Sequence, residues 1–126
     1  MSFVNSLFGN ASKYDTNTAN QEYGNLLGQG EEIIHAYKLI RDAFLFTNQR
    51  LILVDKQGVT GKKIEYMAVP YKSIVRFAVE SSGHFDLDAE LKIWASGMTT
   101  PLQKQFSSTV NIYEVQALLA GFVAKT

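Results

Sequence analysis

From Glu31 onward, apolar and polar side chains alternate along the chain, as is typical of strands that bury one face. The alternation predicts seven short strands, over residues 33–40, 43–47, 51–55, 64–69, 74–80, 86–93 and 102–106. The polar pair Asn48-Gln49 between the second and third predicts a tight hairpin. Pro70 ends the fourth, because proline has no N–H to donate within a sheet. The pattern therefore predicts a compact antiparallel sheet.

The period changes near the C-terminus, where apolar residues recur at helical spacing. The predicted stripe consists of Ile112, Val115, Leu118, Leu119 and Phe122. Asn111, followed three residues later by Glu114, fits an N-cap with a reaching carboxylate, and Thr109 is an alternative cap. Seven short strands form either a sandwich or a barrel, since both remove exposed edges. A terminal helix of this kind is well placed to cover one open end of a barrel.

The first 30 residues are rich in polar side chains, and their apolar residues occur in small clusters. Phe3, Val4, Leu7 and Phe8 predict a short amphipathic helix that Gly9 would end. A second predicted helix starts near Asp15 or Thr16 and stops at Gly28. Its apolar face is formed by Tyr23, Leu26 and Leu27. Both helices are short, so we expect them to pack on the main body or on another subunit.

Composition limits the classes of function. The length of 126 residues fits one domain. Because 12 Lys and Arg residues balance 12 Asp and Glu residues, the net charge creates no electrostatic field that would attract nucleic acid or an anionic membrane. The chain has no cysteine, which excludes disulfides, thiolate metal sites and a cysteine nucleophile. It lacks a charged leader and an apolar run of membrane-spanning length. We expect a soluble cytoplasmic protein that does not bind nucleic acid.

Lys56, Lys62 and Lys63 form the strongest basic cluster, together with Gly58 and Gly61. A glycine-rich loop lets backbone N–H groups approach an anion, and lysines add charge. The spacing fits neither a Walker loop nor a dinucleotide-binding fingerprint. The competing interpretation is a solvated hairpin loop in which the glycines take positive φ. The three lysines are the candidate anion-binding residues.

Two pairs of opposite charges, Arg41 with Asp42 and Arg50 with Asp55, bracket the predicted hairpin. They are candidates for ion pairs across strands or across a subunit interface. A surface pair contributes under ~1 kcal/mol, whereas a desolvated interface pair matters more.

Carboxylates gather around the turn before the sixth strand, at Glu80, Asp86, Asp88 and Glu90, with His84 nearby. Paired carboxylates can do acid–base chemistry or hold a hard cation. A flat strand does not offer the cupped set of oxygen ligands that calcium needs. We therefore expect no metal site here.

Trp94 lies on the predicted outward face of the sixth strand, opposite Leu91 and Ile93. An outward tryptophan either covers a neighbouring element or anchors an interface. His35 lies among apolar strand residues, which favours a hydrogen-bonded structural histidine over a catalytic one. The strand order offers no credible Ser–His–Asp arrangement. We expect no enzyme activity and no cofactor.

Several local strings, in order along the chain, resemble the bacterial pleckstrin-homology-domain family, long catalogued as a domain of unknown function. The resemblance extends from about residue 27 to residue 122. The strings are Arg41-Asp42, Phe46-Thr47-Asn48-Gln49-Arg50-Leu51, Val54-Asp55-Lys56-Gln57-Gly58, Gly61-Lys62-Lys63, Pro70-Tyr71-Lys72-Ser73-Ile74, Val79-Glu80 and Leu87-Asp88-Ala89-Glu90-Leu91-Lys92-Ile93-Trp94.

The resemblance implies a pleckstrin-homology-like (PH-like) seven-stranded antiparallel barrel over residues 31–126, capped by the C-terminal helix and preceded by a helical extension over residues 1–30. It also implies homo-oligomers that form symmetric rings, and no known catalytic activity. Eukaryotic relatives of the fold often bind phosphoinositide head groups through basic residues between their first strands. This chain has only the turn Ile40-Arg41-Asp42 there, so membrane association is not favoured.

The leading hypothesis is a non-enzymatic homo-oligomeric scaffold or protein-interaction module. In a ring, one surface meets a different surface of the next copy; here we expect a strand edge or the N-terminal helices to meet the outward residues of strands five and six. The candidate interface residues are Arg41, Asp42, Arg50, Asp55, Glu80 and Trp94. An unidentified protein partner fits the same hypothesis. The alternative is an anion or phospholipid head-group module that uses Lys56, Lys62 and Lys63, aided by the Phe3–Phe8 helix.

Overall fold

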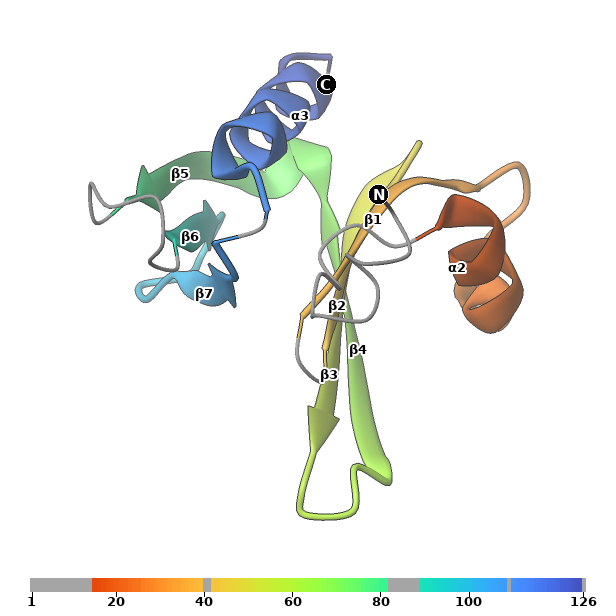
Figure 1. The fold of residues 1–126 in the computed structure, drawn as a ribbon. Helices are drawn as coiled ribbons and strands as arrows, with labels where there is room; N and C mark the ends of the chain where they lie inside the picture. The colour runs from red at the N-terminus through yellow and green to blue at the C-terminus, as the bar shows by residue number, and fades with distance from the viewer. Residues whose placement is uncertain (1–14, 40–41, 82–88, 109, 126) are drawn as a thin grey trace. The chain divides into compact units, whose positions relative to one another are not determined.

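The computed structural model describes residues 15–39, 42–81, 89–108 and 110–125. These residues form seven strands, two α-helices and two 3₁₀ turns, in the order that the sequence predicts for its strands and its C-terminal helix. The chain divides into two compact units, the first ending at Val69 and the second beginning at Pro70. Each unit contains one antiparallel sheet (Figure 1).

The first unit contains a four-stranded sheet in which consecutive strands are neighbours, in the order β1-β2-β3-β4. Its strands are β1 (Ile33–Lys38), β2 (Ala43–Thr47), β3 (Arg50–Gln57) and β4 (Lys63–Pro70). The predicted hairpin is confirmed, because β2 and β3 pair antiparallel on either side of the turn at Asn48 and Gln49. β1 ends earlier than predicted and β3 extends further.

One face of this sheet is covered by α2 (Thr16–Glu22) and the 3₁₀ turn η1 (Gly24–Leu26). Asp15 is the N-cap of α2, as predicted, and its carboxylate accepts hydrogen bonds from the backbone N–H and the hydroxyl of Thr18. The helix ends before the predicted Gly28, because the chain tightens into η1. The predicted helix over residues 3–8 lies outside the described residues. The core on this face consists of Ala19, Tyr23, Ile33, Ala36, Ala43, Leu45, Ile52 and Val54.

The opposite face of the sheet is also buried, so β2 is inaccessible along its whole length. Three aromatic residues of this face pack edge to face: Tyr37 against Phe46 at 6.3 Å between ring centroids, and Phe44 against Phe46 at 5.3 Å. Burial on both faces explains why the sequence of β2 is a nearly continuous run of apolar residues without polar alternation.

The second unit contains a three-stranded sheet in the order β5-β6-β7. It consists of the 3₁₀ turn η2 (Tyr71–Ser73), β5 (Ile74–Glu80), β6 (Ala89–Ala95), β7 (Leu102–Phe106) and α3 (Ile112–Ala124). The register shifts between Ile74 and Arg76, and Val75 within that irregularity is 64% exposed. The predicted alternation is confirmed in the described part of β6, where Leu91 and Ile93 are buried.

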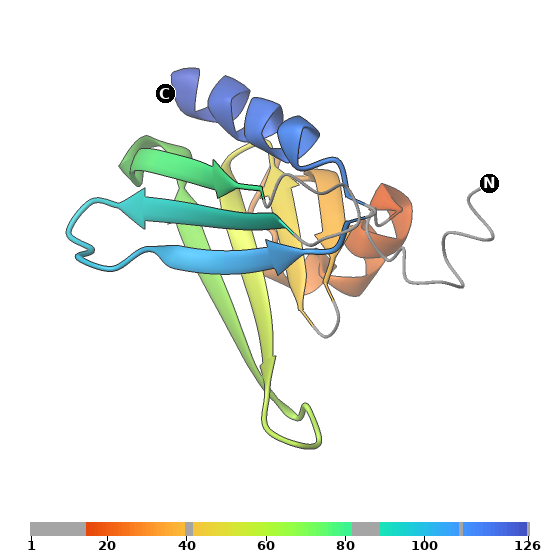
Figure 2. The same ribbon diagram turned by 60° about the vertical axis from the view of Figure 1, so that its left-hand side comes forward.

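The C-terminal helix α3 packs within the second unit against η2 and β5 (Figure 2). Asn111 is its N-cap, as predicted, and its Oδ1 accepts hydrogen bonds from the backbone N–H groups of Tyr113 and Glu114; the alternative cap Thr109 lies outside the described residues. The ring of Phe122 stacks on Tyr71 with centroids 4.7 Å apart. The buried residues of the helix are Ile112, Val115 and Leu119.

Candidate functional site

The β3–β4 hairpin extends past the end of β2, and we call residues 55–64 the arm. At this end of the sheet, β2 pairs with β3 as far as Ala43 and Val54, and the arm continues beyond that pair as a two-stranded ribbon (Figure 1). At its base, the backbone N–H of Lys56 donates to the Asp42 carboxylate at 3.0 Å. Asp42, a predicted interface residue, therefore fixes the place where the arm leaves the sheet.

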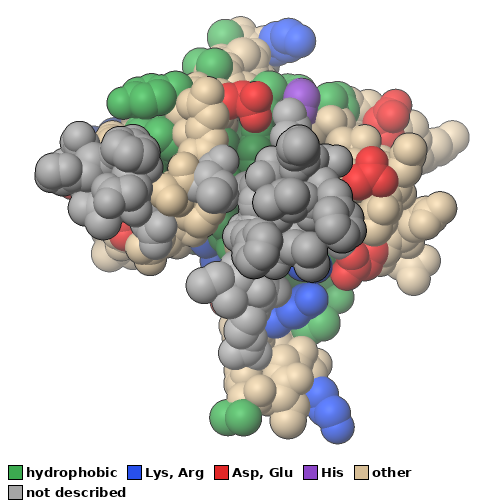
Figure 3. All heavy atoms as spheres, in the orientation of Figure 1, with side chains coloured by type: hydrophobic (Ala, Val, Ile, Leu, Met, Phe, Trp, Pro, Cys, Tyr) green, Lys and Arg blue, Asp and Glu red, His purple; other side chains and the backbone are tan. Residues whose placement is uncertain are grey.

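The tip of the arm is a glycine turn. Gly58 has φ 78° and Gly61 has φ 69°, which confirms the predicted positive φ. Between them Val59 is fully exposed, at 103% of its reference area. Lys62 and Lys63 are exposed, and Lys56 is half-buried. Figure 3 shows basic side chains and a hydrophobic one at the lower end of the molecule, where Figure 1 draws the arm.

The arm therefore carries two exposed lysines, Lys62 and Lys63, close in sequence to its apolar tip, and the half-buried Lys56 at its base. No Asp or Glu occurs from Lys56 to Lys63, so the carboxylate of Asp55 at the base of the arm is the only one within residues 55–64. Such a surface attracts an acidic partner by Coulomb forces, which act over about 10 Å at 0.1 M salt. A lysine head is a strongly hydrated point charge and sets little geometric specificity. The arm is thus suited to docking on a charged surface.

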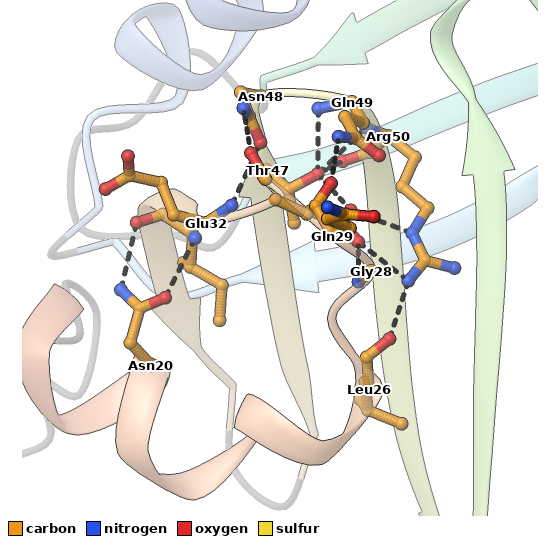
Figure 4. A network of polar contacts seen from close by, with 12 residues as sticks. Asn20, Leu26, Gly28, Gln29, Glu32, Thr47, Asn48, Gln49 and Arg50 are labelled. Carbon is orange, nitrogen blue, oxygen red and sulfur yellow. Dashed lines mark hydrogen bonds and ion pairs between the residues drawn. The ribbon is translucent and has the colours of Figure 1, made fainter.

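A second candidate region is the turn between β2 and β3, whose polar side chains bind the segment that precedes β1 (Figure 4). Arg50 Nε donates to Glu31 Oε2 at 2.8 Å, and Arg50 Nη2 donates to Glu31 Oε1 at 3.0 Å. The same Nη2 also donates to the carbonyl of Leu26 at 2.8 Å. Two parallel bonds between planar groups fix both side chains in orientation.

The other residues of the turn complete this network. The Thr47 hydroxyl lies 2.6 Å from Glu31 Oε2 and 2.9 Å from the Arg50 carbonyl. It has one proton to donate, and the charged acceptor gives the stronger bond. The Asn48 amide donates to the Gly30 carbonyl at 2.9 Å, and its Oδ1 accepts from the N–H of Glu32 at 3.0 Å. The turn is therefore joined to the preceding segment by side-chain bonds.

A similar side-chain link joins α2 to the start of β1. The Asn20 side chain accepts from the N–H of Ile33 at 3.0 Å and donates to its carbonyl at 3.1 Å. Its amide also donates to the carbonyl of Thr16. Asn20 thus completes the backbone bonding of Ile33 as a neighbouring strand would.

These contacts shift the ionisation of the Glu31–Arg50 pair. Hydrogen bonds from Arg50 are the largest cause that lowers the pKa of Glu31, to about 2, and they outweigh the desolvation that opposes it. Bonds from the Gly28 N–H and the Thr47 hydroxyl lower it further. The Glu31 hydrogen bond likewise raises the pKa of Arg50. The pair stays charged throughout the physiological pH range, so its role is structural.

The sequence offers Arg50 and Asp55 as a candidate ion pair, but within the chain Arg50 has a different partner. Arg50 contacts Glu31, whereas the Asp55 carboxylate accepts from the Gln57 amide at 3.2 Å. The sequence pattern did not identify Glu31 as a site residue, although it contains a signal for it. Glu31 precedes Ile33 by two positions, so the alternation of β1 places it on the same buried face as Ile33. A carboxylate on that face predicts a buried cationic or hydrogen-bonding partner.

The outward face of the second sheet holds the other predicted interface residues. The Arg76 guanidinium lies over the Trp94 ring, 4.4 Å from its centroid, and Lys92 Nζ lies 3.5 Å from Glu80 Oε1. Trp94 is therefore partly covered from within its own sheet. In the Lys92–Glu80 pair Glu80 is exposed and Lys92 is half-buried, and a solvent-accessible pair of this kind contributes little to stability.

The structure describes only some of the remaining predicted residues. Arg41, His84, Asp86 and Asp88 lie outside the described residues. His35 is half-buried in β1 opposite Phe46. Within the described ranges there is no cluster of three His, Cys, Asp or Glu residues that could hold a metal ion. Among the helices described, none is long and apolar enough to cross a bilayer.

Comparison with known proteins shows close relatives. The Bacterial PH domain family matches residues 2–123. The "Uncharacterized protein YjqA" of Bacillus subtilis (strain 168) is 52% identical over 122 residues, which cover 96% of this chain and 98% of that protein.

Two solved structures resemble this one along almost their whole length. A DUF1696 family protein with a pleckstrin-homology domain from Shewanella loihica PV-4 is 47% identical with a TM-score of 0.80, and the match covers 89% of this chain and 96% of that chain. A pleckstrin homology domain from Shewanella amazonensis SB2B is 48% identical with a TM-score of 0.80, and the match covers 96% and 98% of the two chains. The predicted PH-like fold is confirmed.

Proposed function

The chain belongs to the bacterial PH domain family, and from that premise we propose that it is a non-enzymatic scaffold or protein-interaction module that assembles with copies of itself into symmetric rings in the cytoplasm. No catalytic step and no cofactor belong to this proposal. Partner proteins would dock on the assembled ring.

The observation that carries the proposal is the apolar edge strand β4. It is the last strand of the first sheet, and strand edges invite pairing with another chain unless they are short or charged. β4 is eight residues long and contains two charged residues, Lys63 and Glu65. Tyr66 is 46% exposed, Ala68 is exposed and Met67 is half-buried. A second copy placed against this edge would cover these side chains.

Light scattering coupled to size-exclusion chromatography tests the proposal at tens of micromolar protein. We expect a discrete mass that is a multiple of 14.1 kDa. Tyr66→Asp should lower that mass, because it places a charge within the proposed contact. Tyr113→Asp is the matched control, since Tyr113 is 66% exposed on α3 in the second unit. A strictly monomeric wild-type protein would refute the proposal.

The exposed lysines and Val59 of the arm favour a second candidate function, binding of an anionic lipid head group. Sedimentation with vesicles that contain phosphatidylglycerol separates the candidates. A lipid-binding protein would pellet, and Lys62→Glu/Lys63→Glu would abolish pelleting. If neither the wild type nor the variant pellets, this second function is excluded.

A further inference from the structure

Charge is separated along the first unit. The segment from Asp15 to Ala36 contains four carboxylates and no Lys or Arg, whereas the segment from Lys56 to Lys63 contains three lysines and no carboxylate. Arg50 neutralises Glu31. The three remaining acidic residues are exposed, and we call them the acidic corner: Asp15, Glu22 and Glu32.

Within the acidic corner, Glu32 lies at the opposite end of the first sheet from the arm. The N–H of Glu32 is bonded to Asn48 in the β2–β3 turn, and β3 runs from that turn to the base of the arm. Eight strand residues span roughly 25 Å at about 3.3 Å each. This distance exceeds the Debye length of about 10 Å at 0.1 M salt. The lysines of the arm therefore do not neutralise Glu32 of their own chain.

From this arrangement we infer that the arm of one copy docks on the acidic corner of the next copy, head to tail. The inference rests on the proposed assembly and names the two surfaces that meet. Lys62 and Lys63 face carboxylates of the corner, so the charges are complementary. The contact joins two different patches, and repetition of such a contact closes a ring when the rotation allows it.

Apolar groups on both surfaces complement the charges. Val59 is fully exposed at the tip of the arm, and Ile34 of β1, two residues from Glu32, is 39% exposed. A two-stranded ribbon is marginally stable in water, and packing on another element stabilises it. Docking therefore covers both exposed side chains and supports the arm. β4 continues from the arm, so the contact extends along the same edge strand.

Charge reversal tests the contact, with two variants that each disable one surface. Lys62→Glu/Lys63→Glu makes the arm acidic, and Glu22→Lys/Glu32→Lys makes the corner basic. Either variant alone presents two surfaces of like charge, and we expect its assembly to weaken by about tenfold or more. An equimolar mixture of the two variants should restore the assembly. The acidic arm of the Lys62→Glu/Lys63→Glu variant fits the basic corner of the Glu22→Lys/Glu32→Lys variant. The native basic arm of the latter fits the native acidic corner of the former.

Lys72→Glu/Lys125→Glu is the matched control, with two exposed lysines of the second unit reversed and the mass expected to stay unchanged. Circular dichroism melts verify that each variant folds. Restoration by mixing supports the inference. If the wild type assembles and the two variants assemble equally well, or if mixing restores nothing, the inference is overturned while the proposed assembly stands. A monomeric wild type overturns both. If Lys62→Glu/Lys63→Glu loses vesicle binding while its assembly mass stays unchanged, the inference is also overturned, and the two lysines are instead membrane-binding residues.

Discussion

At the scale of single residues, Glu31 is the least accessible charged group that the structure describes in this network, with a side chain 1% exposed. Its carboxylate accepts bonds from the Arg50 guanidinium, the Gly28 N–H and the Thr47 hydroxyl. A buried ion pair need not stabilise a fold more than apolar packing would, but removing one partner leaves the other charge uncompensated. We therefore expect a substitution of Glu31 to destabilise the fold even when the new side chain has the same shape but no charge.

Glu31→Gln should lower the free energy of unfolding at pH 7 by about 3 kcal/mol, because the guanidinium loses its counter-charge. The measurement is urea unfolding followed by circular dichroism. Glu32→Gln is the control, since it removes the same charge from the exposed neighbouring position and should change stability by less than ~0.5 kcal/mol. Equal effects of the two substitutions would contradict the structural role of the pair.

The same carboxylate makes stability depend on pH. Its pKa is lowered from 4.5 to about 2 in the folded protein, so the unfolded chain binds the proton more readily. The contribution is complete above pH 4.5 and is lost as pH falls toward 2. The stability difference between wild type and Glu31→Gln should therefore shrink across this window. A difference that stays constant down to pH 2 would contradict the assignment.

Tyr23 gives a second residue-scale prediction at the alkaline end. The pKa of its phenol is raised from 10 to about 12, with burial as the largest cause and the nearby Glu22 carboxylate contributing to the same shift. The phenol therefore stays protonated in the folded protein, and its stabilising contribution is lost as pH rises from 10 to 12. Absorbance titration of the tyrosinate band should show a late component that Tyr23→Phe removes. If all tyrosines of the wild type titrate near pH 10, the prediction fails.

At the scale of elements, local sequence signals predicted most of the structure. The Asn48-Gln49 turn, the Asp15 and Asn111 caps and the spacing of apolar residues in α3 each act over a few positions. The elements that differed are those where tertiary contacts compete with local preference. The N-terminal helix stops at Glu22 because the chain turns into η1 and places Leu26 and Leu27 against the sheet.

The packing of α3 gives a prediction at this scale. Leu119 is fully buried, so Leu119→Ala should destabilise the protein by about 2–5 kcal/mol through lost burial and a cavity. Tyr113→Ala on the exposed face of the same helix should cost little, since Tyr113 is 66% exposed. Thermal unfolding of both variants checks this. Comparable losses would show that α3 does not depend on its buried stripe.

At the scale of the whole molecule, a net charge of zero hides a strong local separation. The acidic corner and the basic arm occur in different segments of the chain, and the sheet places Glu32 of the corner at the opposite end from the arm. Uniform charge would repel copies of the protein, whereas this separation lets opposite ends of two copies attract. Assembly through exposed charges must also respond to salt.

Raising sodium chloride from about 50 mM to about 500 mM should shift the sedimentation profile toward smaller species, because screening weakens contacts between exposed charges. The Glu31–Arg50 pair lies within one chain and its carboxylate is buried, so salt screens it less and the melting temperature should change much less over the same range. Sedimentation velocity measures the first effect and circular dichroism the second. Assembly that strengthens with salt would instead indicate an interface dominated by apolar side chains such as Tyr66.

The sequence alone determined the order of the strands, the tight hairpin, the helix caps and the likeness to bacterial PH domains, because alternation, helical spacing and turn chemistry are set by neighbouring residues. Only the tertiary structure decided that Arg50 binds Glu31, 19 residues away, and that Val75 lies exposed in a strand irregularity. It also decided that the lysines extend on an arm away from Glu32 of the acidic corner. These features depend on strand register and burial, which arise only when distant segments of the chain meet.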